Sequence, residues 1–152
     1  MKRILITGAA GAIGKVLRAA YGGKYQLRLS DIAPLGDVAP GEQLVSADIT
    51  DLAACERMMQ GVECVVHLGG VSVEDAWEKI LPANIAGCYN VFEAARRAGV
   101  KRVIFASSNH AVGFHRRQAP DSPQSMGDVR VSDYRCPAPD FVAHAGALFC
   151  WW

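Results

Sequence analysis

The sequence has no excess of charge of either sign and no long apolar run. Its 16 lysine and arginine residues are balanced by 15 aspartate and glutamate residues, which gives a formal net charge of +1. That balance argues against binding of nucleic acid or of a membrane surface by charge alone. No apolar run approaches the length of a membrane-spanning helix, so we expect neither nucleic acid nor membrane as a partner.

Paired cysteine motifs are also missing from the sequence. The five cysteines are odd in number and scattered, with no Cys-x-x-Cys pair: Cys55, Cys64, Cys88, Cys136 and Cys150. Such a set predicts neither a disulfide framework nor a zinc site. It fits a reducing compartment, so the sequence predicts a cytoplasmic protein without a bound metal.

The strongest positive signal lies near the amino terminus. Residues 3–7 are mostly apolar and lead into a turn with Gly8, Gly11 and Gly14, and apolar residues then recur at helical spacing between 16 and 20. In a strand, phosphate loop and helix of this kind, the glycines allow a tight turn, close approach of a pyrophosphate and close packing of helix on strand. The unpaired N–H groups and the dipole of the helix N-terminus favour the diphosphate. We therefore predict a dinucleotide site that includes Gly8, Gly11, Ala12, Ile13 and Gly14.

A carboxylate follows this turn at the expected distance. Residues 26–31 are predicted to form a second strand that ends in Asp31. A carboxylate in that position accepts hydrogen bonds from the ribose hydroxyls and repels a 2′-phosphate, so it selects NAD over NADP. The alternative interpretation is a strand-to-helix turn that has only a structural role.

Strands and helices continue to alternate after Asp31. Further strands are predicted at 43–47, 63–68 and 101–106, with a helix from Asp51 to about Met59 and a long helical region that Gly99 ends. In that region one apolar face is predicted, and Pro82 either opens the main helix or kinks a longer one. The residues of this face are Trp77, Ile80, Leu81, Asn84, Cys88, Val91, Phe92 and Ala95.

This alternation predicts an α/β fold with right-handed crossovers. The expected architecture is a Rossmann-like, doubly wound parallel sheet of about five strands in the order 3-2-1-4-5. Periodicity is lost soon after the fifth strand. We therefore expect an NAD-binding domain over residues 1–115 and an irregular, divergent tail over residues 116–152.

An open parallel sheet binds its ligand beyond the carboxyl ends of the strands. At these ends Asp48 is expected to hold the adenine amino group, with Ile49 covering the ring; the alternative for Asp48 is a helix cap. The bare backbone of Leu68, Gly69 and Gly70 is expected to lie against the cofactor. Two further polar residues are expected to have structural roles: His67 as a hydrogen-bonded core imidazole, and Asn84, on an apolar helix face, as a buried amide that must find hydrogen-bond partners.

Taken together, these stretches resemble the extended short-chain dehydrogenase/reductase family of NAD-dependent epimerases and dehydratases. The resemblance covers residues 2 to about 115. It is carried by Thr7-Gly-Ala-Ala-Gly-Ala-Ile-Gly14, Asp31, Asp48-Ile49, His67-Leu-Gly-Gly70, Asn84-Ile-x-Gly87 and Ser107-Ser108. Within the family, two stretches are most similar to uronate dehydrogenases: Leu68-Gly-Gly-Val-Ser-Val-Glu74 and Phe105-Ala-Ser-Ser-Asn-His-Ala-Val-Gly113.

The resemblance implies NAD-dependent oxidation of a hexuronic acid, such as galacturonate or glucuronate, to an aldaric acid lactone. It implies that Ser107 contacts the cofactor and that Ser72, Ser108, Asn109 and His110 contact the sugar acid. Ser108 would also be the catalytic serine. The structural alternatives are a strand-end serine bonded to backbone for Ser108 and a solvated loop histidine for His110. A homo-oligomer is a possible arrangement, and a sugar-nucleotide epimerase or dehydratase is the alternative activity.

One part of the family pattern is absent from the sequence. The family's reaction uses a tyrosine phenolate as base and a lysine four residues later in the same helix. No tyrosine here has a lysine at that spacing, and Lys101 is the last lysine. We therefore expect impaired catalysis, an incomplete sheet without the substrate lobe, and a truncated or frame-shifted carboxyl-terminal part. The alternatives are a non-catalytic NAD-binding module and an inactive fragment.

Overall fold

The computed structural model describes residues 2–107 and places them around one parallel sheet of five strands. The sheet order is β3-β2-β1-β4-β5, as the sequence predicts. Each strand lies within one residue of its predicted bounds. The strands are β1 (Arg3–Thr7), β2 (Gln26–Asp31), β3 (Glu42–Ser46), β4 (Cys64–His67) and β5 (Arg102–Phe105).

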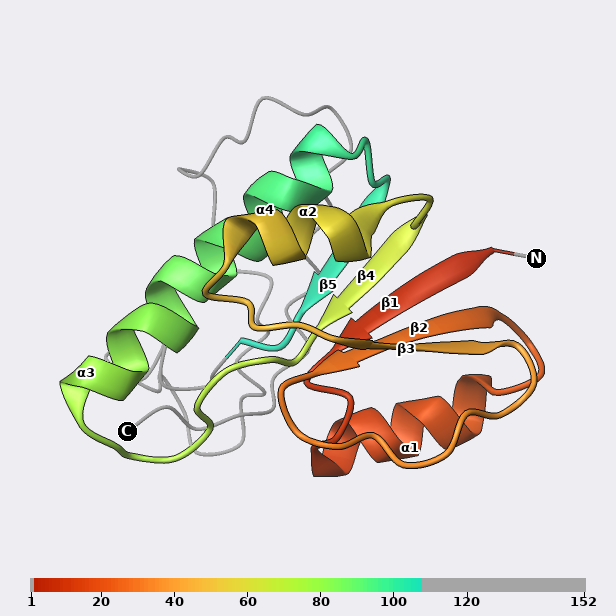
Figure 1. Cartoon of the computed structure of the whole chain (residues 1–152), viewed down its shortest axis with the longest axis horizontal. Helices are drawn as coiled ribbons and strands as arrows, with labels where there is room; N and C mark the ends of the chain where they lie inside the picture. The colour runs from red at the N-terminus through yellow and green to blue at the C-terminus, as the bar shows by residue number, and fades with distance from the viewer. Residues whose placement is uncertain (1, 108–152) are drawn as a thin grey trace, which may run out of the picture.

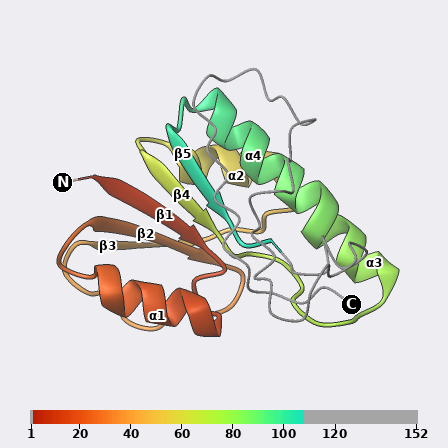
Figure 2. The ribbon, with the colours of Figure 1, turned by 180° about the vertical axis from the view of Figure 1, so that it is seen from behind.

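Helices cover both faces of this sheet, which confirms the doubly wound architecture (Figure 1). One face carries α1 (Ala12–Tyr21), and the opposite face carries α2 (Leu52–Met59) and α4 (Gly87–Arg97). The reverse view shows α1 beneath β1, β2 and β3, and α4 running beside β5 on the other side (Figure 2). Before α4 come a short helix α3 (Trp77–Ile80) and a π-helix η1 (Leu81–Ala86).

The alternation of side chains along β1 divides the core into two layers. Ile4 and Ile6 pack in the layer beneath α1, together with Leu27 and Leu29 of β2. Leu5 faces the other way and packs in the layer formed with α2 and α4. Because successive residues of a strand point to opposite faces, a continuous apolar run such as Ile4-Leu5-Ile6 is what a doubly covered parallel strand needs.

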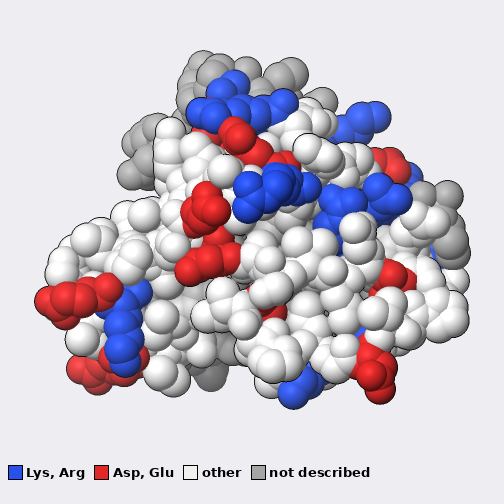
Figure 3. Space-filling model, viewed as in Figure 1, with Lys and Arg blue, Asp and Glu red and all other residues white. Residues whose placement is uncertain are grey.

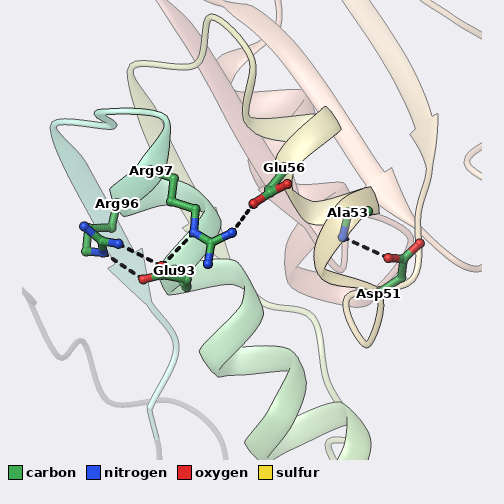
Figure 4. Close-up of polar contacts among 6 residues, drawn as sticks. All are labelled: Asp51, Ala53, Glu56, Glu93, Arg96 and Arg97. Carbon is green, nitrogen blue, oxygen red and sulfur yellow. Dashed lines mark hydrogen bonds and ion pairs between the residues drawn. The ribbon is translucent and has the colours of Figure 1, made fainter.

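The helix ends follow the predicted signals. Asp51 is the N-cap of α2 and accepts a hydrogen bond from the Ala53 N–H, at 2.9 Å from Oδ1. Beyond α4, Gly99 has φ +68°, a conformation that glycine adopts without strain. On the outer surface, α2 and α4 are joined by an ion pair between Glu56 and Arg97 (Figure 4).

Pro82 lies inside a continuous helical region, so of the two interpretations the longer, interrupted helix is confirmed. The interruption is η1, in which the Gly87 N–H donates to the carbonyl of Pro82, five residues back. A π-turn rotates the residues that follow it relative to those before it. The predicted single apolar face is therefore wrong at Trp77 and Leu81, residues that are 60% and 40% exposed.

Charged side chains of both signs are interspersed over the face of the molecule that α2 and α4 cover (Figure 3). This distribution agrees with the near-zero net charge of the sequence. Within residues 2–107, none of the helices is long and apolar enough to cross a membrane. Ser108, Asn109, His110 and the predicted tail over residues 116–152 lie outside the described residues.

Candidate functional site

The glycine turn between β1 and α1 excludes side chains at two of its three glycines. Gly8 has φ +67°, and a Cβ there would lie 2.7 Å from the carbonyl carbon of Leu68. A Cβ on Gly14 would lie 2.6 Å from the Cα of Ala9. At Gly11 a Cβ would meet only the carbonyl oxygen of Gly8, at 3.2 Å. Gly8 and Gly14 are thus fixed by packing of the protein on itself, whereas a Cβ on Gly11 would make one tight contact.

Three backbone donors are left over at the start of α1. The Gly11 N–H donates to the Gly8 carbonyl and the Lys15 N–H to the Gly11 carbonyl. The N–H groups of Ala12, Ile13 and Gly14 have no partner among the described residues, and the N-cap Gly11 has no side chain to supply one. Unpaired donors and the positive end of the helix dipole together suit an anionic group such as a diphosphate.

The carboxylate of Asp31 is held against this turn by backbone donors. Its Oδ2 accepts from the Ala10 N–H at 2.9 Å, and its Oδ1 accepts from the Ala33 N–H at 2.9 Å. A carboxylate has about four acceptor positions, so the two that remain are available to ribose hydroxyls. The contact with Ala10 also fixes the distance between the acid and the anion-binding turn.

The ends of the strands surround a cleft of about 850 Å³. All the predicted cofactor-binding residues except Ser107 line this cleft: Gly8, Gly11, Ala12, Ile13, Gly14, Asp31, Asp48, Ile49, Leu68, Gly69 and Gly70. Ser107 follows β5 and is half-buried. Ser72, a predicted substrate-binding residue, also lines the cleft. Their binding roles stay predictions, as do those of Ser108, Asn109 and His110.

Asp48 does not cap α2, since that position belongs to Asp51. Its Oδ1 instead accepts from the Thr50 N–H at 2.9 Å, closing a small turn at the rim of the cleft. Of the two interpretations of Asp48, the helix cap is therefore wrong. Contact with an adenine stays a prediction.

The imidazole of His67 is fully buried and hydrogen-bonded, as predicted for a structural histidine. Its Nδ1 lies 2.7 Å from Thr7 Oγ1, and its Nε2 lies 3.3 Å from Cys88 Sγ. Burial lowers the pKa of His67 to about 4 and raises the pKa of the Cys88 thiol to about 11. Both groups are therefore neutral near pH 7.

The amide of Asn84 finds its partners in the loop that follows β4. Its Oδ1 accepts from the Val71 N–H at 2.8 Å, and its Nδ2 donates to the Val71 carbonyl at 3.1 Å. This pair confirms that the amide is satisfied, and it holds the loop that carries Ser72. Because η1 contains Asn84, the interrupted helix forms one wall of the cleft.

Three residues around the cleft were not identified from the sequence as organising it: Thr7, Cys88 and Asn90. A polar residue at the end of an apolar strand is a usable signal, and it would have singled out Thr7. Nothing in the sequence brings Cys88 to His67 or Asn90 to residues about 40 positions earlier. Those contacts arise only from the packing of α4 on the sheet.

Comparison with known proteins agrees with this geometry. Residues 4–136 match the model of the NAD dependent epimerase/dehydratase family. A uronate dehydrogenase of Pseudomonas putida is 50% identical over 131 residues, which are 81% of this chain and 49% of that protein. An NAD-dependent glucose-6-phosphate dehydrogenase of Haloferax volcanii is 36% identical over 144 residues, 90% of this chain and 55% of that protein.

A solved structure also resembles this chain in fold and sequence. A mutant uronate dehydrogenase from Agrobacterium tumefaciens, complexed with NAD, has a TM-score of 0.73 and 46% identity, covering 81% of this chain and 48% of that one. The chain spans about half the length of the uronate dehydrogenases it matches. Motif, sheet order and sequence identity all agree, and the chain belongs to the NAD-dependent epimerase/dehydratase family.

Proposed function

We propose that this chain binds NAD in the cleft at the carboxyl ends of its strands. The amides of Ala12, Ile13 and Gly14, which have no partner within residues 2–107, would hold the diphosphate, and Asp31 would accept from the adenosine ribose. The observation that carries the proposal is the position of the Asp31 carboxylate. It lies within one hydrogen bond of the turn that would hold the diphosphate. A 2′-phosphate would meet this carboxylate, so the preference expected is NAD over NADP.

The oxidation of a hexuronic acid is the activity that we propose for this site. Support comes from the identity to uronate dehydrogenases over most of this chain. When bound, NAD accepts the hydride that leaves the anomeric carbon of the sugar acid. Ser72 would contact the sugar acid from the loop that Asn84 holds, and Ser108, Asn109 and His110 would be its further contacts, with Ser108 catalytic.

A non-catalytic NAD-binding module is the second candidate. The observation that favours it is the absence of a Tyr-x-x-x-Lys sequence from the 152 residues. The family's chemistry takes a hydroxyl proton with such a tyrosine, so this chain would bind the cofactor without rapid turnover.

Calorimetric titration of the full chain with NAD and with NADP tests the binding proposal. We expect saturable binding of NAD and weaker binding of NADP. A folded chain that ignores NAD at millimolar concentration would contradict it. Absorbance of NADH in mixtures with NAD and galacturonate or glucuronate then separates the two candidates. Turnover supports the dehydrogenase, and NAD binding without turnover at high protein concentration supports the module.

A further inference from the structure

We propose that Gly87 and Asn90 of α4 are positioning residues for the wall of the cleft formed by Asp48 and Ile49. Neither Gly87 nor Asn90 is among the described residues that line the cleft, whereas Asp48 and Ile49 both line it. The proposal rests on the proposed binding of NAD. It adds that two residues outside the cleft determine the affinity of the chain for the adenosine half of NAD.

Asn90 ties this wall to α4 by two hydrogen bonds. Its Nδ2 donates to the carbonyl of Ile49 at 3.0 Å and to the carbonyl of Thr50 at 3.0 Å. A side-chain amide has two N–H donors, so Asn90 uses its full donor capacity on two successive carbonyls. A carboxylate of the same shape would present oxygen to both carbonyls and would repel them.

Gly87 provides the space into which Ile49 packs. A Cβ on Gly87 would lie 2.8 Å from Ile49 Cγ1 and 2.9 Å from Ile49 Cδ1. The backbone of Gly87 has φ −63° and ψ −43°, which any residue adopts in a helix. Glycine is less favourable than alanine inside a helix, and no unusual conformation requires it here. Close packing accounts for glycine at this position: Ile49 is the nearest neighbour, and the Pro82 carbonyl oxygen would lie 3.3 Å from the Cβ.

Besides these contacts, the turn receives a hydrogen bond from the Cys55 thiol of α2 to the Ile49 carbonyl, at 3.4 Å, and Ile49 packs against the core. The bonds within the turn join the Asp51 N–H to the Asp48 carbonyl and the Thr50 N–H to Asp48 Oδ1. Such bonds shape the turn but do not set its distance from the rest of the cleft. Gly87 and Asn90 lie three residues apart on α4, so they contact the turn side by side. We infer that these contacts set the distance between the turn and the rest of the cleft.

The same helical region also holds a second part of the cleft wall through Asn84 and Val71. One continuous piece of helix, from η1 into α4, therefore fixes two loops of the cleft that lie more than 20 residues apart in sequence. A shift of this helix would move both parts of the wall, whereas loss of the Asn90 contacts would release only the part at Ile49.

Asn90→Asp in the full chain is the decisive variant, with Asn90→Ala beside it. The matched control is Gln60→Glu, which makes the same amide-to-carboxylate change on an exposed residue at the end of α2. We expect Asn90→Asp to raise the Kd for NAD and for AMP by the same factor, about tenfold, and Asn90→Ala to raise both by less. Gln60→Glu should bind both ligands like the original chain.

Equal affinity of Asn90→Asp and the original chain for AMP would overturn the proposal, as would a loss of NAD affinity that AMP does not share. Hydrogen exchange without ligand gives a readout that does not depend on NAD. The amides of residues 49–53 should exchange faster in Asn90→Asp than in Gln60→Glu, and equal rates would also overturn it. If the original chain binds neither ligand, the proposed function fails, and exchange alone decides whether Asn90 holds the turn.

A double substitution tests the packing of Ile49 on Gly87. Gly87→Ala should lower the Tm of the original chain, because the new Cβ meets the Ile49 side chain. In an Ile49→Ala background the same change should lower the Tm much less, since Cγ1 and Cδ1 are then absent. An equal loss in both backgrounds would show that Gly87 does not accommodate Ile49.

Discussion

The hydroxyl of Thr7 and the imidazole of His67 are joined by a hydrogen bond of 2.7 Å between Oγ1 and Nδ1. The same Oγ1 accepts from the N–H groups of Leu68 and Gly69, each at 3.2 Å. The Leu68 N–H also donates to the carbonyl of Thr7, at 3.2 Å. With both N–H groups on its two lone pairs, the hydroxyl has its one proton to donate to Nδ1. In that arrangement the neutral His67 carries its own proton on Nε2, the nitrogen next to Cys88 Sγ. This chain of bonds holds the Leu68–Gly69 backbone at the floor of the cleft.

Removing the Thr7 hydroxyl should destabilise the fold. Thr7→Val keeps the shape of the side chain but leaves His67 Nδ1 and the Gly69 N–H without partners, at a cost of about 1–3 kcal/mol. Thr7→Ser keeps the hydroxyl, so its free energy of unfolding should fall much less. Urea titration measures the free energies of unfolding. Thr50→Val is the control, since it makes the same change at an exposed residue; equal stability of the two valine variants would contradict the prediction.

Acid should destabilise the fold through His67 before most carboxylates titrate. Burial lowers the pKa of His67 to about 4, from an ordinary value of 6.5. Between these values the unfolded chain binds a proton that the folded chain does not. Stability is therefore complete above pH 6.5 and falls as the pH drops towards 4. For this histidine alone, the free energy of unfolding should be about 2 kcal/mol lower at pH 5 than at pH 7.

Urea titrations at the two pH values measure this loss, and His67→Gln is the comparison. The variant is expected to be less stable than the original chain at pH 7. Between pH 7 and pH 5, however, the fall in its free energy of unfolding should be about 2 kcal/mol smaller. The same pH dependence in the variant and in the original chain would assign the effect to other groups.

Replacing Gly14 and Gly11 of the turn by alanine should have different effects on stability and on NAD binding. Gly14→Ala places a Cβ 2.6 Å from backbone atoms of Ala9, so it should cost about 3 kcal/mol of stability. Gly11→Ala meets only the Gly8 carbonyl oxygen, at 3.2 Å, and should lower the melting temperature much less than Gly14→Ala does. Its methyl group would stand where the diphosphate approaches, so we expect an increase of about tenfold in the Kd for NAD. Normal NAD affinity in folded Gly11→Ala would argue against a diphosphate at this turn.

Asp31→Ala should weaken NAD binding and narrow the preference for NAD over NADP. The change removes both the acceptor for the ribose hydroxyls and the charge that repels a 2′-phosphate. We expect the Kd for NAD to rise about tenfold or more, with little change for NADP. Asp37→Ala removes the same charge from an exposed position in the β2–β3 connection and serves as the control. An unchanged ratio of the two dissociation constants would mean that Asp31 does not face the ribose.

The fold was predictable because its signals are local. Apolar runs of strand length, the glycine turn, the acid at Asp51 and the glycine at Gly99 each predict an element or its end, and the alternation of elements predicts the sheet order. The π-helix was not predictable in the same way. Pro82 indicated an irregularity, but sequence spacing alone does not say whether a helix starts, kinks or widens there. The predicted face that included Trp77 and Leu81 failed for that reason.

For the cleft, the sequence determined which residues stand at the carboxyl ends of the strands, because strand length and the parallel topology fix those positions. It also determined Gly8, Gly14 and Asp31, whose chemistry and spacing have few other uses. The tertiary structure decided how these groups are held in place: Thr7 to His67, Asn84 to Val71, and Asn90 to Ile49. Each of these contacts depends on the distance and rotation of packed elements, which are set by side chains meeting across the core and are not written in any local pattern.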